Sequence, residues 1–419
     1  MAAPSHAPPR PTDDPLARGL IVGALLANTV FQKLAIPGTG GALPLSLLLT
    51  TFLVGAGLVL GRLIPVAVVG VGLALTAGVL IACAGLSPGR HFSMNALALL
   101  IVLLMPYAVA LRPGALDPGY PARVFTGLAA LFAALGIVQF FAQFVVGADI
   151  AFYLDRSLPP DLLLANFNNL NELSYGAGVY KANGVFLLEA AFLNQLLCLA
   201  VLVELLGARR LLRLALYGAG IMVTYSGTGL LLLAAILPAY ILHQRYLGLA
   251  AAGAITAVLF VLLAESLGLG TFLDRADEFS SDQSSAFARF FSIFYLLRDY
   301  AWLDWTSVLV GRGPGSVSEQ FNSVGYAAFD PSWGKVMYEY GVIGFVAYFA
   351  FLGACLWRAR GSGYLKAALL LQFMFLGGYV ATTPVHIEFW TLLVWPTLAG
   401  AAARRASLGR RPAPVAQAA

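Results

Sequence analysis

Long apolar stretches recur along almost the whole of this 419-residue chain, and short polar loops separate them. Each stretch has roughly 18 to 22 residues, which in an α-helix is long enough to cross a hydrocarbon core about 30 Å thick. Charged residues make up 11% of the chain, less than half of the usual share in soluble domains. The apolar stretches lack the period-two alternation of a membrane barrel. The sequence therefore predicts an all-α polytopic integral membrane protein.

The spacing of the apolar stretches predicts about twelve transmembrane helices. The Pro-rich N-terminus is expected to be disordered. Lys and Arg gather in alternate loops and near both ends, so the positive-inside rule places both termini in the cytoplasm. The net charge of +5 is thereby explained by orientation, and no nucleic-acid partner is expected. We divide the chain into a cytoplasmic N-terminus (1–18), transmembrane helices 1–9 (19–267) with an external segment (148–183), a large periplasmic loop (268–335), transmembrane helices 10–12 (336–404) and a cytoplasmic tail (405–419).

The large loop is the one long polar interruption in the chain. From Gly268 to Gly344 the sequence has fourteen charged residues, a concentration that favours a functional site there. Helical periodicity also predicts short interfacial helices in this loop, because one face is aromatic. Arg289 and Arg298 are nine residues apart and would point to opposite sides of an unbroken helix. We expect Arg298 to pair with Asp299 and Arg289 to be the functional charge. The residues of the expected aromatic face are Phe287, Phe290, Phe291, Phe294 and Leu297.

Three short patterns resemble the O-antigen ligase and Wzy-type polysaccharide polymerase superfamily. KANGVFLLEAAFLNQ is similar to its Arg-x-x-Gly-x-Phe element, with Lys181 at the arginine position. Arg289 followed by LVGRGPGS is similar to its loop arginine and later glycine-rich turn. YEYGVIG is similar to the signature that opens the span after the loop, with Glu339 as its acidic residue. Two long external segments and about twelve spans agree with that architecture.

The departures from the family pattern favour a polymerase over a ligase. Ligases commonly place a His-Asn pair nine residues before the acidic residue of the signature. Here that position is Asp330, followed by Pro331. Gly227 also stands where relatives often have a basic residue.

The resemblance implies a protein of the bacterial inner membrane that carries out glycosyl transfer at the outer face of that membrane. A glycan on an undecaprenyl diphosphate carrier would move onto the sugar end of a second lipid-linked repeat unit, in an inverting reaction without metal or cofactor. The partners implied are the lipid-linked donor and acceptor, membrane lipids and a chain-length regulator. Two other functions stay open, namely an O-antigen ligase and a transporter or flippase of lipid-linked sugars.

The chemistry requires cations for the diphosphate leaving group and a group that accepts the acceptor's proton. Arg289 is the first candidate, because a guanidinium binds phosphate through two hydrogen bonds. Lys181 and Arg312 would add positive charge at the same hollow, and the turn around Arg312 has backbone N–H groups for an anion. Asp330 is the candidate base, and it also suits the cap of the next helix. The external segments contain no Asp-x-Asp pair, so no metal site is expected.

Further residues complete the expected site. Glu339 joins Asp330 and Arg289 in the catalytic set. Glu189, about a turn inside the sixth span, is expected to face a cavity or a partner such as Lys181, because a charge inside a span is costly. His386 lies in a short external loop and is the alternative base. The binding set comprises Lys181, Arg312, Lys335, Arg298, Glu189, Arg156 and His386. The cysteines Cys83, Cys198 and Cys355 lie in apolar stretches and are interpreted as core residues.

Overall fold

The computed structural model describes residues 14–87, 92–165, 167–173, 176–244 and 285–396. The described residues are mostly helical. The expected ninth span, the first part of the large loop and the cytoplasmic tail lie outside the described residues.

Three of the described helices are long and apolar enough to cross a membrane, namely α3 (Ala67–Leu86), α5 (Tyr120–Val145) and α17 (Ser332–Arg358). This supports the predicted association with a membrane. Shorter apolar helices occupy most of the other predicted span positions, and the total of twelve spans stays a prediction. These shorter helices are α1 (Pro15–Thr29), α2 (Leu45–Val59), α4 (Met94–Leu104) with the 3₁₀ turn η1 (Met105–Ala108), α8 (Ala190–Leu206), α9 (Leu211–Thr224), α10 (Thr228–His243), α18 (Gly363–Phe375), and α19 (Pro384–Phe389) with the π-helical turn η7 (Trp390–Val394).

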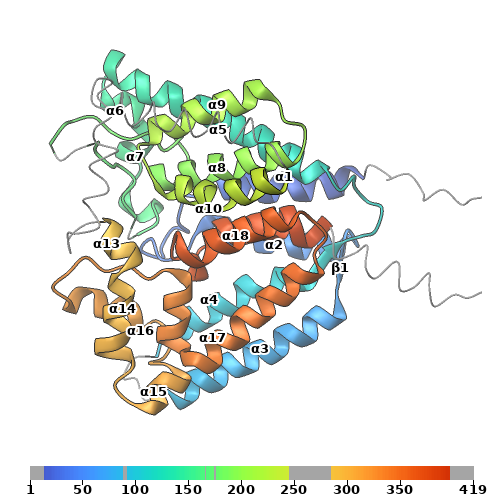
Figure 1. The fold of residues 1–419 in the computed structure, drawn as a ribbon, viewed down its shortest axis with the longest axis vertical. Coiled ribbons are helices and arrows are strands. Elements are labelled where there is room, and N and C mark those ends of the chain that lie inside the picture. The colour runs from blue at the N-terminus through green and yellow to red at the C-terminus, as the bar shows by residue number, and fades with distance from the viewer. Residues whose placement is uncertain (1–13, 88–91, 166, 174–175, 245–284, 397–419) are drawn as a thin grey trace, which may run out of the picture.

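The helices pack in two groups joined by α18 (Figure 1). In the first group, α8 packs against α5, α9 and α10, and in the second, α17 packs along α3. α18 contacts α8 and α10 on one side and α17 on the other. At one end of the bundle, β1 (Leu63–Pro65) pairs antiparallel with β2 (Val109–Leu111), with Leu63 opposite Leu111. This pairing fixes the ends of α2 and α4 next to each other.

The described part of the large loop folds at the opposite end of the bundle from β1 (Figure 1). The expected aromatic helix is interrupted at Phe291, whose φ of −113° separates two short helices. Phe291 and Phe294 are exposed as expected of an interfacial face, whereas Leu297 is buried and packs with Ile293. The elements of this region are α13 (Ser285–Phe290), α14 (Ser292–Leu296), the π-helical turn η4 (Leu297–Ala301), α15 (Trp305–Val310), α16 (Ser316–Gln320) and the 3₁₀ turn η5 (Phe321–Ser323).

The expected external segment also contains short elements. These are α6 (Ala148–Ala151), α7 (Tyr153–Ser157) and the 3₁₀ turn η2 (Pro160–Leu162). The chain after η2 runs beside the connection between α1 and α2, because the N–H of Ala35 donates to the carbonyl of Leu162 and the N–H of Leu164 to that of Lys33. The segment is therefore attached to the first helical hairpin of the chain.

Candidate functional site

A cavity of about 620 Å³ lies where the large loop meets the helical bundle. Its wall includes Arg289 from α13, Glu189 just before α8, and Asp330 just before α17. Part of the remaining wall comes from residues 376–379 and Thr382, around the 3₁₀ turn η6 (Tyr379–Ala381). The structure thus brings together three predicted site residues that are far apart in the sequence.

Arg289 presents a cation to this cavity. Its guanidinium carbon lies 5.7 Å from the centre of the Phe329 ring, a cation–π distance. Within the described part of the chain, no carboxylate forms an ion pair with Arg289. Arg289 therefore places a positive charge at the wall of the cavity.

Glu189 contributes a carboxylate to the wall of the same cavity as Arg289. Its Oε1 accepts a hydrogen bond from the N–H of Asn168 at 2.8 Å. Burial raises the pKa of the Glu189 carboxyl, while the Asn168 N–H and the positive charge of Arg289 act in the opposite direction. The prediction that Glu189 lies a turn inside the sixth span is wrong, because α8 begins at Ala190. Glu189 stands at the mouth of the bundle, on the wall of the cavity.

Asp330 is held by an ion pair. Its Oδ2 lies 2.8 Å from Nζ of Lys335, which in turn lies 3.2 Å from Oε1 of Glu339. The predicted capping role of Asp330 is wrong, because α17 begins at Ser332 with Pro331 as its N-cap residue. Glu339 is buried and lines neither this cavity nor its neighbour. It is therefore a partner of Lys335 rather than a group that faces a substrate.

Ser332 connects α17 to the far wall of the same cavity. Its backbone N–H and its hydroxyl both donate to the carbonyl of Gly377, at 3.1 Å each. Its hydroxyl oxygen also accepts the N–H of Tyr379 at 2.8 Å. These contacts fix Asp330 relative to the chain after α18.

A second cavity, of about 530 Å³, adjoins the first. Phe167, Ser318 and Thr382 line both cavities. Lys335 lines the second cavity while its partner Asp330 lines the first. One ion pair therefore lies between two neighbouring hollows, an arrangement that can place two bound molecules in contact.

In the glycine-rich turn, the N–H groups of Arg312 and Gly313 donate to backbone carbonyls, so these two groups do not bind an anion as we expected. The N–H of Arg312 donates to the carbonyl of Tyr338 at 2.9 Å, and that of Gly313 donates to the carbonyl of Glu339 at 3.0 Å. Gly311 and Gly341 have φ of +81° and +63°, which glycine adopts readily. A Cβ added to either glycine would lie 2.4 Å from the backbone of the segment that contains the other. The turn therefore packs tightly against a kink in α17.

The other predicted cations lie away from the first cavity. Arg312 contacts Oγ of Ser307 at 3.3 Å and lies 3.9 Å from Oδ2 of Asp304. Lys181 is half-buried, and its N–H donates to the carbonyl of Asn171. Neither Arg312 nor Lys181 lines the cavity that contains Arg289, so the structure does not bring the three expected cations together.

Two further arginines have partners in the described structure. Arg298 pairs with Asp299 at 2.6 Å, as we expected. Arg156 pairs with Asp149 at 2.6 Å, and its guanidinium carbon lies 5.2 Å from the ring centre of Tyr180. These arginines therefore have local roles in the loops that contain them.

His386 is not the external residue that the sequence predicted. It is fully buried in α19, and its Nδ1 lies 3.0 Å from the hydroxyl of Tyr107. Its ring stacks on Trp390 and meets the edge of Phe373. These contacts identify His386 as a core residue and remove it as the alternative base.

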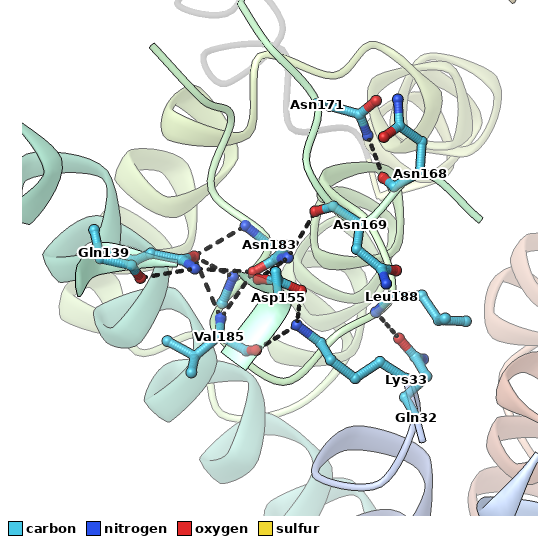
Figure 2. Close-up of polar contacts among 12 residues, drawn as sticks. Gln32, Lys33, Gln139, Asp155, Asn168, Asn169, Asn171, Asn183, Val185 and Leu188 are labelled. Atoms are coloured by element: carbon cyan, nitrogen blue, oxygen red, sulfur yellow. Dashed lines mark hydrogen bonds and ion pairs between the residues drawn. The ribbon is translucent and has the colours of Figure 1, made fainter. Parts of the chain in front are cut away.

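A buried polar cluster around Lys33 and Asp155 was not predicted from the sequence (Figure 2). Nζ of Lys33 donates at 2.5 Å both to Oδ1 of Asp155 and to the carbonyl of Val185. Asn183 donates to the other carboxylate oxygen of Asp155 and to the carbonyl of Asn169, at 3.1 Å each. The only sequence signal was a lysine near the end of an apolar stretch, a position that usually indicates a side chain extending to the membrane surface.

Comparisons of the chain with protein-family models, with curated proteins and with solved structures find no match. Among the described residues, no group of three or more His, Cys, Asp or Glu side chains has the arrangement of a metal site. The three cysteines are free and buried.

Proposed function

We propose that this protein is a membrane glycosyltransferase that polymerises lipid-linked glycans. The donor glycan is attached to a polyprenyl diphosphate, and the acceptor is the sugar end of a second lipid-linked repeat unit. The supporting observation is the cavity that Arg289, Glu189 and Asp330 line together, beside a second cavity that shares part of its wall. Two adjoining cavities suit a reaction between two large substrates.

In this proposal the acceptor hydroxyl oxygen attacks the anomeric carbon of the donor. A new glycosidic C–O bond forms, and the C–O bond to the diphosphate breaks with its electron pair leaving on the phosphate oxygen. Asp330 accepts the hydroxyl proton. Arg289 stabilises the negative charge that develops on the diphosphate.

Lys335 and Glu339 act on Asp330 rather than on the substrates. Lys335 donates to one oxygen of Asp330 and leaves the other oxygen for the acceptor hydroxyl. Glu339 forms a second ion pair with Lys335 and so helps to hold its ammonium group in place. A carboxylate held in this way has a defined direction, which general acid–base catalysis requires.

The two alternative functions predict other products from the same substrate. A ligase would add a glycan once, to an acceptor that carries no polyprenyl diphosphate. A transporter or flippase would move the lipid across the bilayer without changing it. We favour polymerisation over transport because the charged residues line a cavity where the large loop meets the bundle, whereas transporters place their binding groups near the middle of the membrane.

The decisive experiment supplies the purified protein in vesicles with a defined lipid-linked repeat unit. A ladder of products with release of the polyprenyl diphosphate supports polymerisation. A single addition, unchanged lipid on the other side of the vesicle, or no reaction contradicts it. Asp330→Asn is expected to lose the ladder while it retains binding of the donor, and Asp117→Asn at the other end of the bundle is the matched control.

A further inference from the structure

We propose that Lys33 and Asp155 are positioning residues that hold the chain segment before α8, which contributes to the walls of both cavities, in its working shape. Nothing in their sequence context assigns this role to them. The proposal concerns the site described above, and its relevance to catalysis rests on the proposed function. The structural part is independent of any activity.

The segment that this pair holds has a strained backbone. Val185 has φ of +72°, a conformation that is rare for a β-branched residue and that persists only where the surroundings enforce it. Here hydrogen bonds to the backbone N–H groups and to a backbone carbonyl of the segment hold this conformation. Oε1 of Gln139 accepts the N–H groups of Asn183, Gly184 and Val185 at 3.1, 3.0 and 3.3 Å, and Lys33 donates to the carbonyl of Val185.

The same cluster extends to residues that line the cavities (Figure 2). Gln32, next to Lys33, accepts the N–H of Leu188 at 3.0 Å. Leu188 and Gln32 line the second cavity, and the following residue, Glu189, lines the first. A shift of the chain between Val185 and Leu188 would therefore change both cavities at once.

The opposite side of the cavity is tied to the cluster as well. Asn183 donates to the carbonyl of Asn169, and the preceding residue Asn168 supplies the N–H that binds Glu189. The carboxylate of Asp155 holds Asn183 through its second oxygen. Asp155 thus connects the two chain segments that flank Glu189.

Burying an ion pair in this space has a large desolvation cost in free energy. The side chains of Lys33 and Asp155 are 2% and 1% exposed, and burying two charges often gives no net stability compared with apolar side chains of the same size. What the apolar side chains cannot supply is the set of hydrogen bonds to Val185 and Asn183. The geometry therefore favours positioning, rather than stability alone, as the role of the pair.

The first test is hydrogen–deuterium exchange on the full-length protein. In Lys33→Met the backbone amides of residues 183–188 are expected to exchange at least about tenfold faster, because the strained turn loses its restraint. The control is Glu204→Gln, which removes a partly buried ion pair with Arg213 near the C-terminal end of α8. Unchanged exchange of residues 183–188 in Lys33→Met, or equally faster exchange in Glu204→Gln, would overturn the proposal.

A double variant separates positioning from stability. Lys33→Met with Asp155→Leu fills the space with apolar groups, so the melting temperature is expected to return close to that of the wild type, while the fast exchange of residues 183–188 remains. If the exchange returns to the wild-type rate together with the melting temperature, the pair has only a structural role and the proposal fails.

The link to catalysis is tested last. With the lipid-linked repeat unit as substrate, Lys33→Met is expected to change both KM and kcat, Lys33→Arg to restore them in part, and the double variant to stay impaired. An unimpaired double variant with fast exchange would reject the catalytic relevance and leave the structural role. Failure of the wild-type protein to form any product would instead reject the proposed function. The structural role would remain, because the exchange result does not depend on activity.

Discussion

Nζ of Lys335 lies 2.8 Å from Oδ2 of Asp330, so that one ion pair joins the first turn of α17 to the wall of the first cavity. The same Nζ lies 3.2 Å from the buried carboxylate of Glu339. The ammonium group therefore compensates two negative charges in a place with little access to water. We therefore expect the first turns of α17 to lose stability without it.

Replacing Lys335 by Met should destabilise the protein by about 3–5 kcal/mol, because the buried carboxylate of Glu339 loses its counter-charge. Lys335→Met with Glu339→Leu should recover much of this loss, because the uncompensated charge is gone. Thermal unfolding in detergent measures both. A double variant that is less stable than Lys335→Met would contradict this account of the pair.

Arg289→Ala should lower the rate of transfer by roughly 10²–10³-fold, the usual effect of losing one group that stabilises developing negative charge. Arg289→Lys should lose less, because the charge remains while the two-fold hydrogen bonding is lost. Initial rates with the lipid-linked repeat unit provide the measurement. Arg123→Ala removes an exposed arginine that pairs with Asp117 elsewhere, and it should leave the rate unchanged.

Binding of the lipid diphosphate should strengthen as the pH falls through the pKa of Glu189. Burial raises this pKa above the ordinary value of 4.5, so the carboxylate takes up a proton at a higher pH than an exposed one. Protonation removes the negative charge that competes with the diphosphate for Arg289. A diphosphate diester stays ionised over this range, so the change is expected to come from the protein.

Glu189→Gln is the control for this pH dependence. It should bind the donor tightly at every pH, with a flat profile, because the competing charge is absent throughout. A titration of a fluorescent polyprenyl diphosphate against protein in detergent measures the affinity. If Glu189→Gln keeps the pH dependence of the wild type, another group is responsible.

Gly311→Ala should destabilise the protein by at least about 1–2 kcal/mol, because an L-residue is strained at positive φ and because its Cβ would lie 2.4 Å from the backbone of Glu339. Gly218→Ala is the matched substitution in α9, where a Cβ meets no atom within 4 Å. It should be neutral or slightly stabilising, since Ala favours helix over Gly. Melting temperatures of the two variants test the difference.

The helices that are long and apolar enough to cross a membrane could be predicted from the sequence, because length and hydropathy are local properties of each segment. Length and hydropathy identify α3, α5 and α17 without any knowledge of their neighbours. The pairing of Arg298 with Asp299 was predictable for the same reason, since the two residues are adjacent in the chain. Local signals of this kind need no tertiary information.

The composition of the site depends on contacts between distant segments, which one sequence does not reveal. The sequence identified Glu189, Arg289 and Asp330 as candidates, but only the fold shows that they share a cavity that Lys181 and Arg312 do not line. Asp330 precedes a helix, and its position favoured a cap until the structure showed Lys335 as its partner.

Burial explains two further differences between prediction and structure. His386 lies in a polar-looking stretch, and its burial depends on Tyr107 and Phe373, which come from other helices. The ion pair of Lys33 could not be predicted, because its partner Asp155 is 122 residues away in the sequence. A charge in an apolar stretch indicates a partner or a function, without identifying which residue the partner is.

The kink at Gly341 divides α17 into two parts with different surroundings. The part from Val342 to Arg358 is about 25 Å long at 1.5 Å per residue, close to the thickness of a bilayer's hydrocarbon core. This part alone is long enough to cross most of that core. The part of α17 before Gly341 is then left for the two cavities, where the glycine-rich turn and Gly377 hold it through backbone hydrogen bonds.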